Sequence, residues 1–196
     1  MVEHGVARSE LILGGQKSGK SRRAQDLAEA WLTGMPGRRA MLVATAMATD
    51  DEMRERIARH QGDRARQLPA LVTLEEPLEM AACIAQHSRA DTLLVVDCLT
   101  LWLTHLTWPG HHALLPPGDQ APDPALAMAA LLSVMQGAPG PVVLVSNEIG
   151  LGVIPMGREV RNFVDALGQL NQRVASVCQR VTLMSAGLPL VLKGPA

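Results

Sequence analysis

Aromatic residues are almost missing from this chain, whose 196 residues include one Phe, three Trp and no Tyr. Proteins that bind single-stranded nucleic acid stack the bases on such side chains, so the scarcity argues against that function. It also means that Leu, Val, Ala and Met fill the core. The length suits one α/β domain over residues 1–196 with a core of its own, and no second full domain is expected.

Other absences exclude further classes of protein. The three cysteines, Cys83, Cys98 and Cys178, show no C-x-x-C or Cys/His ligand spacing, which predicts reduced thiols and no structural disulfide. The formal net charge is -1 and the basic residues are spread along the chain, so no nucleic-acid partner is expected. No apolar run approaches the ~18 residues that span a bilayer, and the charged N-terminus lacks the apolar stretch of a signal peptide. We therefore expect a soluble, cytoplasmic protein.

Short, wholly apolar runs alternate with longer segments of helical period. Such runs are typical of strands buried on both faces, as in a parallel sheet covered by helices; they lie at 11–13, 41–43, 71–72, 93–96, 142–145 and 181–184. Residues 50–66 and 158–179 have the pattern of amphipathic helices. A turn at 185–189 followed by an apolar run at 190–192 predicts a C-terminal antiparallel edge hairpin. We expect a flexible N-terminus at 1–8 and a long loop at 108–124.

One motif carries chemistry on its own. Eight consecutive residues match the pattern G-x-x-x-x-G-K-[ST] between a predicted strand and a predicted helix, the context that a phosphate-binding P-loop requires. The glycines let backbone N–H groups surround the phosphates, the lysine contacts the outer phosphates and the final hydroxyl ligates Mg²⁺. The predicted phosphate-binding residues are Gly14, Gly15, Gln16, Lys17, Ser18, Gly19, Lys20 and Ser21.

A carboxylate for the metal should follow a second buried strand, and Asp97 does so. Its position also suits the N-cap of the next helix, and the sequence leaves both interpretations open. Asn147 and Glu148 end another apolar run and lead into a loop on the side of the sheet where α/β proteins bind ligands. This loop either closes on an acceptor substrate or simply connects a strand to a helix.

The predicted helix at 50–66 carries a second group of residues. Helical spacing puts Arg56, His60 and Arg64 in one row, with Arg59 beside it. Neighbouring arginines lower the pKa of an imidazole and keep it neutral, as a nucleophile must be, while attracting a triphosphate. From spacing alone, a second interpretation has the greater weight: His60 only continues the apolar stripe of Met53 and Ile57.

Taken together, these residues resemble one enzyme family, the bifunctional adenosylcobinamide kinase / adenosylcobinamide-phosphate guanylyltransferase of cobalamin biosynthesis. The resemblance spans nearly the whole chain. It comprises the P-loop, Val43-Ala-Thr-Ala46, the 51–64 helix with its histidine, Val96-Asp-Cys-Leu-Thr-Leu-Trp102, Val145-Ser-Asn-Glu-Ile-Gly-Leu-Gly-Val-Ile-Pro155 and Asn171-Gln-Arg173. Some relatives have two adjacent histidines where this chain has Arg59-His60.

The resemblance implies two reactions on one scaffold. Adenosylcobinamide, a corrinoid, is phosphorylated with ATP or GTP, and GMP is then transferred from GTP to that phosphate through a covalent guanylyl-histidine. The resemblance also implies a RecA-like order of mostly parallel strands, Mg²⁺ as cofactor and a homotrimer with nucleotide sites near the subunit contacts. By position, His60 corresponds to the guanylylated histidine and Lys20 to a catalytic residue.

The family's remaining nucleotide contacts also transfer by position. They correspond to Ala44, Thr45, Ala46, Gln61, Gly62, Asp63, Arg64, Glu75 and Asp97, and the metal ligands to Ser21 and Asp97. Two rival interpretations remain: another small-molecule P-loop kinase in which His60 is structural, and a nucleotide-gated RecA-like ATPase with a macromolecular partner. A third, a guanylyltransferase that has lost kinase activity, is disfavoured because Lys20 and Ser21 are intact.

Overall fold

The computed structural model describes residues 5–48, 50–108 and 121–194, and at positions 56, 60 and 63–65 it describes the backbone alone. The strands are β1 (Ser9–Gly14), β2 (Arg39–Ala44), β3 (Leu71–Glu75), β4 (Thr92–Asp97), β5 (Val142–Val145), β6 (Arg180–Ser185) and β7 (Leu188–Lys193). The helices are α1 (Lys20–Gly34), α2 (Asp51–Gln67), α3 (Met80–His87), α4 (Leu99–Thr107), α6 (Pro124–Gly137) and α7 (Arg158–Val177).

The strands form one seven-stranded sheet in the order β3-β2-β4-β5-β1-β6-β7. Every neighbouring pair is parallel except β6 and β7, which form the antiparallel hairpin predicted at the C-terminal edge. Strand β5 separates β1, which leads into the P-loop, from β4, which ends in Asp97. This confirms the predicted RecA-like, mostly parallel α/β fold.

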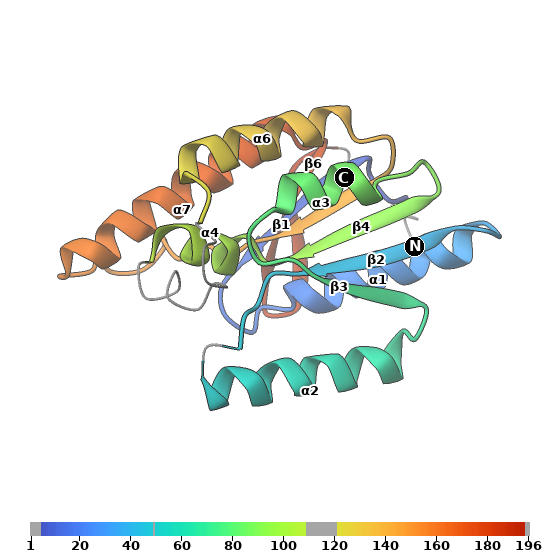
Figure 1. Cartoon of the computed structure of the whole chain (residues 1–196), viewed down its shortest axis with the longest axis horizontal. Coiled ribbons are helices and arrows are strands. Elements are labelled where there is room, and N and C mark those ends of the chain that lie inside the picture. Colours follow the sequence, from blue (N-terminus) through green and yellow to red (C-terminus); the bar gives the residue numbers. More distant parts are fainter. Residues whose placement is uncertain (1–4, 49, 109–120, 195–196) are drawn as a thin grey trace.

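Helices cover both faces of the sheet, as Figure 1 shows. Along β1, Leu11 and Leu13 pack into the cluster formed with α3, α4, α6 and α7, whereas Ile12 packs on the opposite face against α1. Successive side chains of a strand point to opposite faces, so a run that is apolar at every position serves two layers. The central apolar runs are therefore strands, as predicted, because each run packs against helices on both of its faces.

Helix α2 is the exception to this layered packing. It lies beside α1 and β3 in Figure 1, connected to the sheet at each of its ends. None of its described residues enters either cluster of buried residues. Strand β3 lies at the edge next to it, and Val72 is 53% exposed. The prediction that the run at 71–72 is buried on both faces is therefore wrong, because β3 is the edge strand and the side chain of Val72 enters neither cluster of buried residues.

The helix ends follow from local chemistry. Asp123 caps α6, since its side chain accepts hydrogen bonds from the N–H groups of Ala125 and Leu126, and Pro124 occupies the first turn. Most of the loop predicted at 108–124 lies outside the described residues. Within the described part of the chain, no helix combines the length and apolar character needed to cross a membrane.

Candidate nucleotide site

The P-loop follows β1 and needs glycine at two positions. Gly14 has φ of +153°, and a Cβ there would lie 2.6 Å from the carbonyl oxygen of Met184. Gly19 caps α1 with φ of +103°, a left-handed conformation that side chains disfavour. The turn of the C-terminal hairpin braces the loop, because the N–H of Gly187 donates to the carbonyl of Ser18 at 2.9 Å. The hairpin thus fixes the shape of the phosphate-binding loop.

Lys20, the P-loop lysine, is held inside the loop. Its side chain is mostly buried, and its Nζ donates to the carbonyl oxygen of Gly15 at 2.7 Å. Burial lowers the pKa of Lys20, and the nearby Asp97 carboxylate partly opposes that effect. Lys20 is therefore positioned by the loop through this hydrogen bond.

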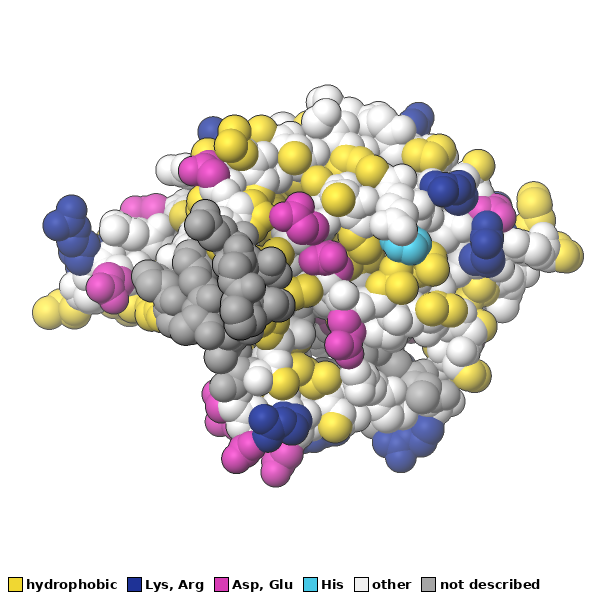
Figure 2. Space-filling view, in the orientation of Figure 1, with side chains coloured by type: hydrophobic (Ala, Val, Ile, Leu, Met, Phe, Trp, Pro, Cys, Tyr) yellow, Lys and Arg dark blue, Asp and Glu magenta, His cyan; other side chains and the backbone are white. Residues whose placement is uncertain are grey.

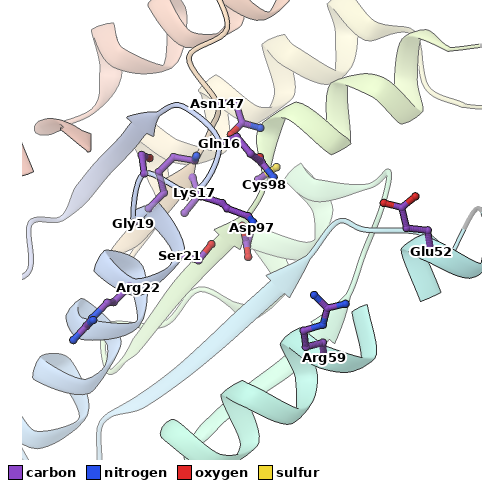
Figure 3. Close-up of a pocket in the computed structure, with 13 residues that line it drawn as sticks. Gln16, Lys17, Gly19, Ser21, Arg22, Glu52, Arg59, Asp97, Cys98 and Asn147 are labelled. Atoms are coloured by element: carbon purple, nitrogen blue, oxygen red, sulfur yellow. The ribbon is translucent and has the colours of Figure 1, made fainter. Parts of the chain in front are cut away.

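A cavity of about 520 Å³ lies between the P-loop and α2 (Figure 3). Its lining comes from four parts of the chain: Gln16, Lys17, Ser18, Gly19, Lys20, Ser21 and Arg22 from the P-loop and the start of α1, Glu52 and Arg59 from α2, Asp97 and Cys98 after β4, and Val145 and Asn147 after β5. Cationic groups predominate over carboxylates in this lining. Such a cavity suits a polyphosphate.

A smaller cavity of about 110 Å³ adjoins the first and shares Ser21, Asp97 and Cys98 with it. The remaining lining consists of Ala44, Ala46, Met53, Ile57, Gln61, Glu75 and Leu101. Gln61 Nε2 donates to Glu75 Oε1 at 3.1 Å, which links α2 to the end of β3. The cavity is mainly apolar, and its polar groups include the carboxylates of Glu75 and Asp97 and the amide of Gln61, a composition that suits a planar base.

Ser21 and Asp97 line the same space although 75 residues separate their positions in the chain. A hydroxyl oxygen and a carboxylate oxygen are the ligand types that Mg²⁺ uses, together with substrate phosphates and water. Among the described residues, no three His, Cys, Asp or Glu side chains gather closely enough to hold a metal. The donor set therefore fits a metal shared with a nucleotide.

A buried polar network fixes the strand ends beneath the cavities. The Thr45 hydroxyl donates to the carbonyl of Cys98 at 2.9 Å and accepts from the N–H of Cys98 at 2.8 Å, and the N–H of Thr45 donates to the carbonyl of Asp97 at 3.1 Å. His105, also buried, has Nε2 at 2.9 Å from the carbonyl of Thr45. Because a carbonyl only accepts, Nε2 carries the proton. The peptide bond between Asp97 and Cys98 is cis.

The structure brings many of the predicted nucleotide contacts together and places others elsewhere. Residues 16–21, Ala44, Ala46, Gln61, Glu75 and Asp97 line the two cavities. Thr45 has a fully buried side chain that is bonded to Cys98 and lies outside both linings, and its contact with the nucleotide stays a prediction. Gly14 shapes the loop, the Gly15 carbonyl holds Lys20, and Gly62 is exposed outside both linings.

Three predicted side chains, those of His60, Asp63 and Arg64, lie outside the described residues. The backbone of position 60 is helical within α2. Its neighbours in sequence, Arg59 and Gln61, line the large and the small cavity respectively. With about 100° per residue, position 60 lies between them on the helix surface. The catalytic role of His60 remains a prediction.

Sequence reasoning placed Asn147 on the ligand-binding side of the sheet without predicting it as a nucleotide contact, and it missed Arg22, Cys98 and His105. Asn147 lines the cavity because α4 and α7 hold its backbone: its N–H donates to Thr100 Oγ1 at 3.0 Å, and its carbonyl accepts from Asn171 Nδ2 at 3.1 Å. Arg22 directly follows Ser21 and Cys98 directly follows Asp97, so both could have been predicted from their position next to predicted site residues. No spacing pattern predicted the position of His105, because its contact with the Thr45 carbonyl depends on how α4 packs against the end of β2.

The loop after β5 exposes an apolar surface. Leu151 and Ile154 are largely exposed and Val153 and Met156 are each 96% exposed. In Figure 2, apolar side chains are visible at the tip where α7 begins. On the same face, Lys and Arg side chains are scattered and do not gather in one patch. The loop is thus a separate feature from the polar lining of the nucleotide cavity.

Solved structures share the fold at low sequence identity. The structure of Project ID PH0250 from Pyrococcus horikoshii OT3 aligns with a TM-score of 0.50 over 97% of this chain and 88% of that chain, at 8% identity. The flagellar accessory protein FlaH from Methanocaldococcus jannaschii aligns with a TM-score of 0.48 over 96% and 80% of the two chains, at 13% identity. At these identities, the likeness of the Pyrococcus structure bears on the fold alone.

Sequence relatives are far closer. The chain is 46% identical to the bifunctional adenosylcobalamin biosynthesis protein CobP of Pseudomonas aeruginosa, over 94% of this chain and 97% of the relative. It is 32% identical to the CobU protein of Salmonella typhimurium and 30% identical to that of Escherichia coli, in each case over 93% of this chain and 98% of the relative. A family profile described as cobinamide kinase / cobinamide phosphate guanyltransferase matches residues 10–192. This chain therefore belongs to the cobinamide kinase / cobinamide phosphate guanyltransferase family of enzymes.

Proposed function

We propose that this enzyme phosphorylates adenosylcobinamide with ATP or GTP and then transfers GMP from GTP to adenosylcobinamide phosphate, giving adenosylcobinamide-GDP and pyrophosphate. Family membership supports the pair of reactions. The observation that carries the proposal in this chain is the cavity between the P-loop and α2, because phosphate-binding residues face the helix that contains His60 across it. One phosphate cradle can therefore serve both steps.

In the kinase step, the aminopropanol hydroxyl oxygen of the corrinoid bonds to the γ-phosphorus as the bond from that phosphorus to the β–γ bridging oxygen breaks. The nucleoside diphosphate leaves with that electron pair, and the hydroxyl proton passes to solvent. Backbone N–H groups of the P-loop and the Lys20 ammonium hold the phosphates in line with the acceptor. Ser21 and Asp97 would hold a magnesium ion, which neutralises charge on the outer phosphates when bound. Positioning and charge stabilisation account for most of the catalysis in such transfers.

In the guanylyl step, a neutral imidazole nitrogen of His60 attacks the α-phosphorus of GTP. The P–N bond forms, the bond from the α-phosphorus to the bridging oxygen breaks, and its electron pair leaves with pyrophosphate. A phosphate oxygen of adenosylcobinamide phosphate then attacks the same phosphorus. The new P–O bond forms as the P–N bond breaks, and the imidazole is returned unchanged.

The smaller cavity suits the guanine base. Its Glu75 carboxylate can accept from the N–H groups of a guanine edge, while Met53 and Ile57 supply apolar contact to the ring. Gln61 already donates to one oxygen of Glu75, which orients that carboxylate. This arrangement explains why GTP would be the guanylyl donor.

The oligomer implied by family resemblance, a homotrimer, is part of the proposal. The exposed apolar side chains of the loop after β5, which include Val153 and Met156, are a surface that subunit contact would cover. Sedimentation equilibrium tests this part independently of activity. A monomer at micromolar concentration would contradict it.

The central experiment mixes the enzyme with Mg²⁺ and GTP labelled at the α-phosphate, then denatures the protein. We expect label on the protein that is labile in acid and stable in alkali, as a phosphoramidate is, and none on His60→Ala. His87→Ala is the matched control, because His87 lies on α3 outside both cavity linings. Failure of the wild-type protein to trap label while it binds GTP would refute the covalent mechanism and favour a simple P-loop kinase.

A further inference from the structure

Among the α2 residues whose side chains the structure describes, Arg59 is the one cation that lines the large cavity. Figure 3 shows Arg59 extending from α2 into the space that separates this helix from the P-loop, where Ser21 and Asp97 also lie. The Arg59 side chain is exposed, and the described residues give it no ion pair. The cavity therefore has a cationic group on the wall opposite the P-loop.

The geometry of a bound triphosphate indicates a role for the Arg59 guanidinium. Lys17, Lys20 and Arg22 approach the phosphates from the P-loop and the start of α1. A triphosphate held along that wall keeps its other side toward α2, where the P-loop cannot reach. A guanidinium on that side can donate two parallel hydrogen bonds to phosphate oxygens, a geometry that a lysine cannot match.

We propose that Arg59 binds the β- and γ-phosphates of the nucleotide from the side opposite the P-loop and holds pyrophosphate as it departs from the α-phosphorus. The second role rests on the proposed guanylyl transfer, whereas the first does not. In that transfer, negative charge grows on the oxygen that bridges the α- and β-phosphorus as its bond to the α-phosphorus breaks. A guanidinium already placed beside the β-phosphate stabilises that charge.

Two neighbours on α2 provide controls of opposite kinds. Arg54 is exposed and pairs with Asp51 within the helix, and it lies outside the cavity lining. Glu52 lines the same cavity and is the carboxylate that α2 contributes to it. Arg54→Ala removes a positive charge from the helix without touching the cavity, whereas Glu52→Gln removes a negative charge from the cavity itself.

Equilibrium binding tests the first role without any catalysis. With Mg²⁺ present, calorimetry on Arg59→Ala should show Kd raised about tenfold for GTP and for pyrophosphate, the effect of losing one charge-assisted hydrogen bond. Kd for GMP should be unchanged, because GMP has no β-phosphate. Arg59→Lys should have a Kd for GTP between those of the wild type and Arg59→Ala. Arg54→Ala should bind GTP with the wild-type Kd, and Glu52→Gln should bind GTP more tightly.

Two binding outcomes would overturn the proposal. One is an Arg59→Ala variant that binds GTP and pyrophosphate as the wild type does. The other is an equal loss for GMP, which would mean that Arg59 serves the base or the fold instead of the outer phosphates. Circular dichroism and the urea midpoint of each variant identify any loss that comes from unfolding of α2.

Reversal of the guanylyl step tests the second role. Guanylylated enzyme is freed of nucleotide, and regeneration of GTP is followed as pyrophosphate is added. Arg59→Ala should need about ten times more pyrophosphate for half-maximal reversal, while Arg54→Ala should need the same amount as the wild type. Equal pyrophosphate requirements would refute the leaving-group role. Absence of label on wild-type protein would instead refute the proposed function and leave the binding result to decide the role of Arg59.

Discussion

Replacement of Thr45 by Val tests whether the buried network under the nucleotide site holds the strand ends in place. Valine has nearly the shape of threonine, so Thr45→Val leaves no void and removes only the hydroxyl. That hydroxyl makes two hydrogen bonds to the backbone of Cys98, donating to its carbonyl at 2.9 Å and accepting from its N–H at 2.8 Å. The N–H of Cys98 would lose the threonine hydroxyl, whereas the carbonyl would still accept from the N–H of Trp102 at 3.2 Å.

The expected cost follows from burial. A fully buried polar group left without a partner costs about 1–3 kcal/mol. Thr45 is fully buried and Cys98 partly so, which places the loss for the N–H in the lower half of that range. The substitution is therefore predicted to lower the free energy of unfolding by about 1–2 kcal/mol. Because Cys98 directly follows Asp97, the Mg²⁺ concentration that supports half-maximal GTP binding should also rise.

Urea unfolding followed by circular dichroism measures the first effect, and titration of GTP binding with Mg²⁺ measures the second. Thr104→Val is the matched control: its hydroxyl donates to the Thr100 carbonyl one turn back in α4 at 2.8 Å, so the change should fall within about 0.5 kcal/mol. A Thr45→Val protein as stable as Thr104→Val would refute the reasoning. Unchanged Mg²⁺ dependence would show that the network stabilises the fold without positioning Asp97.

The remaining predictions concern buried charge, thiols and the P-loop. Glu10 is fully buried and lies 3.7 Å from both Arg23 and Arg180, so Glu10→Ala should lower the free energy of unfolding by about 3–5 kcal/mol. Glu10→Gln keeps a hydrogen-bond acceptor and should lower that free energy by less. Equal losses for the two variants would contradict the charge argument. Burial raises the pKa of Cys178 from 9.0 to about 12, so the folded state keeps a proton that the unfolded state releases, and the stabilisation present below pH 9 is lost as pH rises toward 12. From pH 9 to 10.5, urea unfolding should show that the wild type loses about 2 kcal/mol more of its free energy of unfolding than Cys178→Ala does. The same loss in both proteins would show that the thiol does not contribute to the pH dependence. Lys20→Ala should abolish both phosphorylation and α-label trapping, and kinase turnover by that variant would refute a shared phosphate cradle.

The C-terminal hairpin and the P-loop illustrate a link between distant parts of the chain. The sequence predicts each one separately, from a turn at 185–189 and from the motif at 14–21. In the structure, β6 pairs with β1 and the hairpin turn donates a hydrogen bond to the Ser18 carbonyl. A change in the turn should therefore affect nucleotide binding, a connection that motif analysis cannot supply.

Local patterns were sufficient for most of the fold. Continuous apolar runs and amphipathic segments with period 3.6 depend on near neighbours, so the central strands, α2 and α7 could be predicted from the sequence. The P-loop could be predicted for the same reason, since its chemistry is contained in eight consecutive residues. Edge position is not a local property, which is why the exposure of Val72 on β3 was missed.

The sequence by itself determined the α/β class, the phosphate-binding loop and the candidate residues Asp97 and His60. Only the tertiary structure decided which of these residues share a cavity, because that depends on the strand order, in which β5 alone separates β4 from β1. It likewise decided that Thr45 is buried under the site and that Arg59 faces it. A spacing pattern fixes the side of a helix or strand on which a residue lies, but the packing of neighbouring elements decides what that side meets.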